Sequence, residues 1–236
     1  MPMSNPDLPP IPLVHEPPNW GRLPILDCDE ALYPVPTTGK LRGHSLYFEQ
    51  GIPEASPVVT VRAGVLARLQ TVAESLPRNV SIVVFDGYRP LAVQQFLWDT
   101  FLARIQTDDP MLTPSEAVAR VRQFVAAPVA DPLRPPPHRT GGAVDVYLVD
   151  EAGVELPMGT APDAAQTKSV TRYFEDVPQE PFTTNRRLLW HAMTSAGFAN
   201  YPGEWWHFEY GNQRWANISG AAFAVYGIPG GDDPGL

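Results

Sequence analysis

The segment PGEWWHFEYG, residues 202–211, places an acid and a histidine three positions apart among large aromatic side chains. Burying such polar groups costs free energy unless they are paired or bind a metal ion. If the segment ends as a strand, His207 and Glu209 share one face, and Glu204 faces His207 only from a bend. The Pro-Gly pair before Glu204 favours that bend. The segment therefore predicts either a core strand with two satisfied polar residues or a catalytic acid beside a metal ligand.

The segment HRTGGAVD supplies a second polar pair, His138 and Asp145. Asp145 lies within residues 143–150, whose alternating pattern predicts a strand. The two glycines allow the preceding turn to approach its neighbours closely. A carboxylate among apolar strand residues needs a partner, which is either a backbone turn or a metal ion. The residues of this segment alone leave both interpretations open.

Together, His138, Asp145 and His207 make a typical ligand set for catalytic zinc. Two imidazoles and one carboxylate leave one position of a tetrahedral zinc ion open for water. Zinc lowers the pKa of that water toward about 7, and a nearby carboxylate, for which Glu204 is the candidate, completes the activation. We expect one Zn2+ per chain. The remaining histidines are expected to be structural or to lie in the N-terminal arm or a loop: His15, His44 and His191.

Arg89 lies in the segment FDGYRP, between a predicted strand and a predicted helix. A guanidinium at this junction could hold a substrate carboxylate or stabilise negative charge that develops on a carbonyl oxygen. It could equally pair with Asp86 at the start of the helix. Both roles stay open at this point.

Strands and helices alternate along the chain without the repeated β-α-β unit of a doubly wound fold. This mixture predicts the α+β class, with an antiparallel sheet as the core, helices on its flanks and the zinc site on the sheet. Thr113, with Glu116 three positions later, predicts a capping box at one helix start. Thr184 and Gly197 are expected to cap a later helix at its two ends. The predicted strands are residues 79–85, 143–150 and 205–210, and the predicted helices are residues 61–76, 88–106, 113–125 and 184–198.

The overall composition limits the classes of protein to consider. Of the 236 residues, 44% are hydrophobic, enough for a substantial core, and the formal net charge is -9. Without a basic stripe, nucleic acid and anionic membrane surfaces are not expected as partners. No apolar run approaches the roughly 20 residues that cross a bilayer, and residues 1–18 do not read as a signal peptide. The single cysteine, Cys28, excludes an internal disulfide and fits a reducing cytoplasm.

Proline divides the chain into parts. Ten of its 28 prolines lie within residues 1–36, which excludes a long helix there and predicts an extended arm. We expect residues 1–27 to form this arm, residues 28–226 to form the domain with the zinc site, and residues 227–236 to form a C-terminal tail. Five further prolines before His138 stiffen the segment that delivers this side chain.

Five motifs occur in the order and approximate spacing of one family: FDGYRP, HRTGGAVD, MGTAPD, NRR and EWWH. Over residues 28–210 the chain resembles the D-alanyl-D-alanine dipeptidases, which are VanX-like zinc peptidases. The resemblance implies an α+β zinc hydrolase fold and a small dipeptide as substrate. It also implies zinc on His138, Asp145 and His207, Glu204 as the catalytic base, Arg89 at the scissile carbonyl or oxyanion, and Asp163 as the acid that holds the substrate's ammonium group.

The chain also departs from the family pattern. Pro136 stands where the family usually has a serine, and the loop after Asp163 lacks the family's Ser-His pair. These differences leave the zinc residues in place and affect the region that selects the substrate. We therefore expect zinc-dependent hydrolysis of small dipeptides, with D-Ala-D-Ala as the leading candidate. The alternatives are a D,D-carboxypeptidase or peptidoglycan endopeptidase on a related scaffold, and a non-catalytic module that binds zinc or a ligand.

Overall fold

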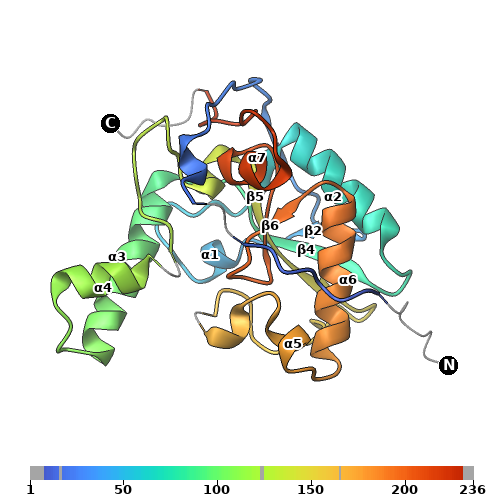
Figure 1. Ribbon diagram of the computed structural model, residues 1–236. Helices are drawn as coiled ribbons and strands as arrows, with labels where there is room; N and C mark the ends of the chain where they lie inside the picture. Colours follow the sequence, from blue (N-terminus) through green and yellow to red (C-terminus); the bar gives the residue numbers. More distant parts are fainter. Residues whose placement is uncertain (1–7, 16–17, 123–124, 165, 231–236) are drawn as a thin grey trace.

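The core of the protein is a five-stranded sheet (Figure 1). The computed structural model describes residues 8–15, 18–122, 125–164 and 166–230. A smaller sheet pairs β1 (Leu32–Pro34) with β3 (Thr60–Arg62). The strands of the main sheet lie in the order β2 (Leu41–Gly43), β4 (Ser81–Asp86), β5 (Ala143–Val149), β7 (His207–Glu209) and β6 (Ala199–Asn200).

The α+β class predicted from the sequence is confirmed, with one difference in the sheet. From β4 through β5 and β7 to β6, neighbouring strands are antiparallel, whereas β2 and β4 run parallel. The sheet is therefore mixed. The parallel pair arises because the chain between β2 and β4 crosses over through α1, β3 and α2 before it rejoins the sheet. Parallel neighbours need such a long connection.

Helices flank this sheet, as predicted. In Figure 1, α2 and α6 contact each other on one side, whereas α3 and α4 form a pair that extends from the other. The helices are α1 (Leu46–Glu49), α2 (Ala63–Ser75), α3 (Leu91–Asp108), α4 (Pro114–Val121), α5 (Tyr173–Asp176), α6 (Phe182–Ser195) and α7 (Gln213–Ser219). Three short 3-10 turns are η1 (Trp20–Arg22), η2 (Pro137–Thr140) and η3 (Thr167–Ser169).

Alternation along β5 separates three fully buried apolar side chains from the face of the sheet that carries Asp145. Val144, Val146 and Leu148 are fully buried in a cluster that includes residues of α2 and α6. Burying each such side chain stabilises the fold by about 1.5–3 kcal/mol. Successive strand residues point to opposite faces, so Asp145 projects away from these three residues, to the face that it shares with Tyr147 and Val149. The functional candidates therefore lie on the sheet face opposite α2 and α6.

The predicted helix caps are correct in two cases and wrong in one. Thr113 and Glu116 make both hydrogen bonds of the capping box at the start of α4. Gly197 follows α6 with a φ of +92°, the left-handed conformation common after a helix end. Thr184 does not cap α6, because the helix begins before it and Pro181 is its N-cap residue.

Two further elements differ from the sequence prediction. The start of the predicted helix 61–76 belongs to β3 instead, where Val61 pairs with Tyr33 of β1. Helix α7 was not predicted, although it has a recognisable cap: Asn212 Oδ1 accepts a hydrogen bond from the N–H of Trp215 at 3.0 Å. Both elements are short, and pairing or capping contacts determine them more than periodicity does.

Residues 8–11 of the N-terminal arm pack against α6 and the start of α5, whereas η1 of the arm contacts α7. Ile11 is buried, its N–H donates to Glu175, and its carbonyl accepts from Arg172. His191 Nε2 lies 2.8 Å from the carbonyl oxygen of Pro9. Of the predicted tail, residues 231–236 lie outside the described ranges. Among the helices of the described residues, none combines the length and apolar character needed to cross a membrane.

Candidate metal centre and active site

Three neighbouring strands present a row of polar side chains on one face of the sheet. The register pairs Asp145 of β5 with His207 of β7 on one side and with Asp86 of β4 on the other. Side chains of directly paired residues project to the same face and lie close together. All three are buried. Strand register thus brings together two segments that are 62 positions apart in the chain.

His138 reaches this row from the turn η2. The turn is followed by Gly141, whose φ of +67° lies in the left-handed region. A Cβ on Gly142 would lie 2.5 Å from the carbonyl oxygen of Tyr210. Both positions therefore need glycine. The carbonyl of His138 accepts a hydrogen bond from the N–H of Arg89 at 3.2 Å, which joins the turn to the segment between β4 and α3.

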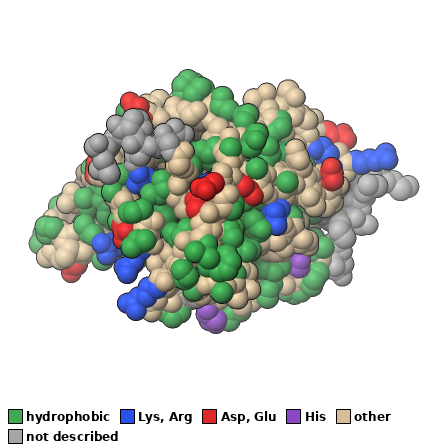
Figure 2. All heavy atoms as spheres, turned by 90° about the horizontal axis from the view of Figure 1, so that it is seen from above, with side chains coloured by type: hydrophobic (Ala, Val, Ile, Leu, Met, Phe, Trp, Pro, Cys, Tyr) green, Lys and Arg blue, Asp and Glu red, His purple; other side chains and the backbone are tan. Residues whose placement is uncertain are grey.

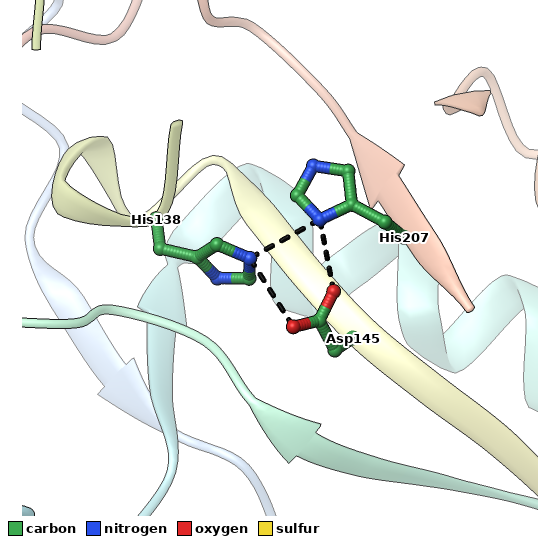
Figure 3. Close-up of side chains that lie close together, drawn as sticks. All are labelled: His138, Asp145 and His207. Carbon is green, nitrogen blue, oxygen red and sulfur yellow. Dashed lines mark hydrogen bonds and ion pairs between the residues drawn. The ribbon is translucent and has the colours of Figure 1, made fainter. Parts of the chain in front are cut away.

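The side chains of His138, Asp145 and His207 converge (Figure 3). His138 Nε2 lies 3.2 Å from His207 Nδ1 and 3.3 Å from Asp145 Oδ2. His207 Nδ1 lies 2.9 Å from Asp145 Oδ1. At metal–ligand bonds of about 2.0–2.1 Å, two ligands of a tetrahedral zinc ion are about 3.3 Å apart. The spacing of the three groups therefore fits a metal ion of this size.

The far nitrogen of each imidazole also has a partner. His138 Nδ1 lies 3.0 Å from the carbonyl oxygen of Gly87 and 3.2 Å from Asp86 Oδ2. His207 Nε2 lies 2.7 Å from Glu209 Oε1. Partners of this kind fix the ring orientation and tautomer of a metal-binding histidine. When the far nitrogen donates its hydrogen, the near nitrogen is left as the acceptor that a metal needs.

The electrostatic surroundings keep Asp145 ionised. Burial alone would raise the pKa of its carboxyl, but the imidazoles of His138 and His207 outweigh burial and hold the pKa well below its usual range. Arg89 adds a cation, with Nη2 3.6 Å from Asp145 Oδ2. The ionised carboxylate is the form that binds a metal.

Glu204 lies in the bend predicted from the sequence. Its N–H donates to the carbonyl of Tyr201 at 3.1 Å, and its Oε2 lies 4.0 Å from His207 Nδ1. Burial raises the pKa of Glu204 to about 8; His207 opposes this rise, while Asp145 and Asp163 add to it. A cation bound nearby would favour the ionised form. The position and the raised pKa suit a group that accepts a proton.

Trp205 fixes the bend to the loop that contains Asp163. Its indole N–H donates to Thr160 Oγ1 at 2.8 Å, and its backbone N–H donates to the carbonyl of Ser169 at 3.0 Å. Buried Arg186 of α6 donates to four carbonyl groups of the same loop region. Trp205 therefore couples the position of Glu204 to that of the loop.

Arg89 is buried and strongly oriented. Its Nε donates to Asp86 Oδ2 at 2.8 Å and its Nη1 to Gln94 Oε1 at 2.8 Å. Its Nη2 donates to the hydroxyl of Tyr47 at 3.2 Å. The pairing with Asp86, which the sequence left as an alternative to a substrate role, is present, and the guanidinium still lines the cavity beside Asp145. Burial would lower the pKa of Arg89, but the carboxylates, Asp86 foremost, raise it above its usual value.

Asp163 lies in the loop after β5 and has a φ of +60°. A left-handed backbone is uncommon for residues other than glycine, although aspartate tolerates it better than most. The hydroxyl of Tyr47 donates to Asp163 Oδ2 at 3.3 Å. Burial raises the pKa of Asp163 to about 7, Asp145 adds to the rise and Arg89 opposes it. A cationic group of a ligand would stabilise the ionised form of this carboxylate.

All six candidate residues named from the sequence line one cavity of about 90 Å3. Two hollows of about 480 and 290 Å3 share Asp163 with it. Pockets for drug-sized ligands measure about 300–1,000 Å3, so the cavity at the metal ligands suits a much smaller molecule.

On the surface shown in Figure 2, basic side chains are scattered among acidic ones rather than gathered into a patch.

The structure adds residues that sequence reasoning missed. Tyr47 and Gln94 contact Arg89, and Arg214 lines the cavity. Glu209 had a usable signal, since its spacing from His207 already placed both on one strand face. Tyr47 had none, because it reaches the site from α1 through tertiary packing. The other histidines lie elsewhere; His44, in a loop as predicted, has its Nδ1 2.9 Å from the hydroxyl of Tyr147.

Comparison with known proteins gives consistent matches. A profile of the D-ala-D-ala dipeptidase family matches residues 57–224. The chain is 39% identical over 218 residues to a D-alanyl-D-alanine dipeptidase of Synechocystis sp., covering 82% of this chain and 87% of the relative. It is 32% identical over 132 residues to a D-alanyl-D-alanine dipeptidase of Escherichia coli, covering 56% and 55%. A solved structure of the vancomycin resistance D,D-pentapeptidase VanY with Zn(II) aligns at a TM-score of 0.41 and 18% identity, covering 87% and 97%.

Proposed function

The chain belongs to the D-ala-D-ala dipeptidase family and is a metallo-dipeptidase, and from this premise we propose that it hydrolyses D-Ala-D-Ala with one bound Zn2+. His138, Asp145 and His207 hold the ion. The observation that supports this proposal most is the convergence of three buried ligand atoms at 2.9–3.3 Å. The substrate is proposed because both relatives described above are D-alanyl-D-alanine dipeptidases.

The chain's own residues divide the work of hydrolysis. Bound zinc supplies Lewis-acid activation of water and of the scissile carbonyl. Glu204 accepts a proton from the attacking water, whose oxygen bonds to the carbonyl carbon. The carbon–nitrogen bond then breaks, and Glu204 returns the proton to the leaving amine. Its location, with Oε2 4.0 Å from His207 Nδ1, puts the base beside the metal ligands.

Arg89 stabilises the negative charge that develops on the carbonyl oxygen. Asp86 and Gln94 hold its guanidinium in place, so little reorientation is needed during the reaction. A preoriented cation in a buried site is most effective for charge that appears only in the transition state.

Asp163 binds the ammonium group of the dipeptide and thereby selects its length. The carboxylate and Glu204 line the same cavity, so the free amino end of the substrate lies close to the scissile bond. A longer peptide would place an uncharged amide at Asp163, and a buried carboxylate without a cation costs free energy.

We also propose a cytoplasmic location, because a single exposed thiol, Cys28, is typical of a reducing compartment.

The proposed activity can be tested with alanine dipeptides of defined chirality. Zinc-loaded protein is incubated with D-Ala-D-Ala, L-Ala-D-Ala and L-Ala-L-Ala, and free alanine is measured. We expect D-Ala-D-Ala to be cleaved fastest, and we expect a chelator to abolish cleavage and added Zn2+ to restore it. Cleavage that persists after complete metal removal would contradict the metal role. Preference for L-Ala-L-Ala would contradict the substrate.

A further inference from the structure

We propose that Glu209 is a positioning residue that holds His207 in the orientation and tautomer that bind the metal, and that Arg214 holds Glu209 in turn. The proposal rests on the metal centre proposed above and does not depend on the identity of the substrate.

The contact between Glu209 and His207 is short and enclosed. The two residues lie two positions apart on β7, so their side chains project to the same face of the sheet. Glu209 Oε1 lies 2.7 Å from His207 Nε2, and the two side chains are 1% and 6% exposed. In this setting water cannot easily replace the carboxylate as the partner of the imidazole.

Arg214 contacts the same carboxylate oxygen of Glu209 that lies beside His207. Its Nη1 donates to Glu209 Oε1. The guanidinium carbon lies 4.5 Å from the ring centroids of both Trp20 and Tyr201, so two aromatic rings hold it in place. The arginine compensates the charge of a carboxylate that would otherwise be costly to bury. The contacts therefore form a chain from α7 through β7 to the metal ligand.

The ring of His207 needs such a restraint, because only one of its nitrogens faces the other ligands. Nδ1 lies 2.9 Å from Asp145 and 3.2 Å from His138 Nε2. Rotation about the bond from Cβ to the ring would move Nδ1 away from both groups and would break the contact with Glu209. Because Nε2 donates its hydrogen to Glu209, Nδ1 remains the free acceptor.

The first test is Zn2+ affinity, measured by competition with a chromophoric chelator in the absence of any peptide. We expect Glu209→Gln to weaken zinc binding by roughly 10- to 100-fold, the usual effect of losing such an outer partner. Glu175→Gln is a matched control, because the side chain of Glu175 is also only 5% exposed and pairs with Arg187 at 2.6 Å. Glu175→Gln should bind zinc as the wild type does. Equal affinity of Glu209→Gln and wild type would overturn the proposal.

A second test needs no variant and holds even if Glu209→Gln fails to fold. In the zinc-loaded wild type, nitrogen NMR of labelled histidine should show a protonated Nε2 and a metal-bound Nδ1 at His207. A metal-bound Nε2, or an Nε2 that exchanges its hydrogen freely with water, would overturn the positioning role. Neither test involves D-Ala-D-Ala, so failure to cleave that dipeptide would count against the proposed substrate and not against Glu209.

Discussion

Asp145 and Asp163 line the same cavity, yet their surroundings affect their carboxyl groups in opposite ways. Burial raises the pKa of both, but at Asp145 the two imidazoles more than reverse it, and the pKa falls well below its usual range. At Asp163 burial prevails over Arg89, and the pKa rises to about 7. The carboxylate of Asp145 is compensated within the protein, whereas Arg89 and the hydroxyl of Tyr47 only partly offset the burial of Asp163.

The two carboxylates also differ in how they are held. Asp145 lies in the middle of β5, between paired strands on both sides. Asp163 lies in a loop with a left-handed backbone, held by the hydroxyl of Tyr47. A rigid sheet suits a metal centre, whose ligands must keep their geometry, while a loop suits a site that binds and releases substrate. The comparison supports the proposal that the metal binds at one end of the cavity and the substrate's ammonium group at the other.

His207→Ala should abolish zinc binding at the end of the cavity that contains Asp145, and this is the largest effect we expect. Loss of one of three protein ligands should leave less than about one hundredth of the wild-type zinc affinity and no detectable hydrolysis. Metal analysis of the purified variant measures this directly. His191→Ala is the control, because His191 contacts the carbonyl of Pro9 and lies outside the cavity. Full zinc occupancy in His207→Ala would show that the metal binds elsewhere.

Glu204→Gln should separate metal binding from catalysis. The amide is nearly the same shape as the carboxyl but cannot accept a proton from water, so the rate should fall by roughly 10²–10⁴ or more. Zinc content should stay at one per chain. Measurement of kcat together with metal analysis makes this test. Near-normal turnover would assign the base to another residue that lines the cavity.

Arg89→Ala should lower kcat much more than it raises KM, since charge on the carbonyl oxygen develops mainly in the transition state. Arg89→Lys should restore only part of the activity, because lysine cannot reproduce the planar contacts with Asp86 and Gln94. Steady-state kinetics on both variants provide the test. A change in KM alone would make Arg89 a residue that holds the substrate carboxylate.

The smallest effect concerns stability at the substrate end. The folded-state pKa of Asp163, about 7, lies above that of an unfolded aspartate. Between about pH 4 and pH 7 the unfolded chain therefore binds fewer protons at Asp163 than the folded chain does. The free-energy cost of burying Asp163 thus grows through this range and is fully present above pH 7. Asp163→Asn, which keeps the shape and tolerates a positive φ, should raise the free energy of unfolding by about 1–2 kcal/mol at pH 8 and by little at pH 4.

Denaturant unfolding of metal-free wild type and Asp163→Asn at the two pH values measures this difference. A variant that is less stable than wild type at pH 8 would show that Asp163 is a structural residue of the loop. It would also remove the distinction between the two ends of the cavity.

Strand alternation and residue chemistry were enough to predict those elements and site residues that short stretches of sequence determine. Alternation identified β5, and residue chemistry singled out His138, Asp145 and His207 before any contact was known. The pairing of Asp145 with Asp86 could not be predicted, because strand register is set by tertiary packing. The three-residue strand β2 is too short to show a period, so its parallel pairing was missed. Likewise, the contact of Tyr47 with Asp163 joins residues 116 positions apart.

The most direct test of the central claim compares D-Ala-D-Ala with its N-acetyl form as substrates. If Asp163 recognises a free ammonium group, wild-type protein should cleave the free dipeptide at least about 100-fold more efficiently, measured as kcat/KM, because the acetyl group leaves a buried carboxylate without its cation. In Asp163→Asn this preference should largely disappear, mainly through loss of activity on the free dipeptide. Equal cleavage of both substrates by the wild type would contradict the account and would indicate a D,D-carboxypeptidase.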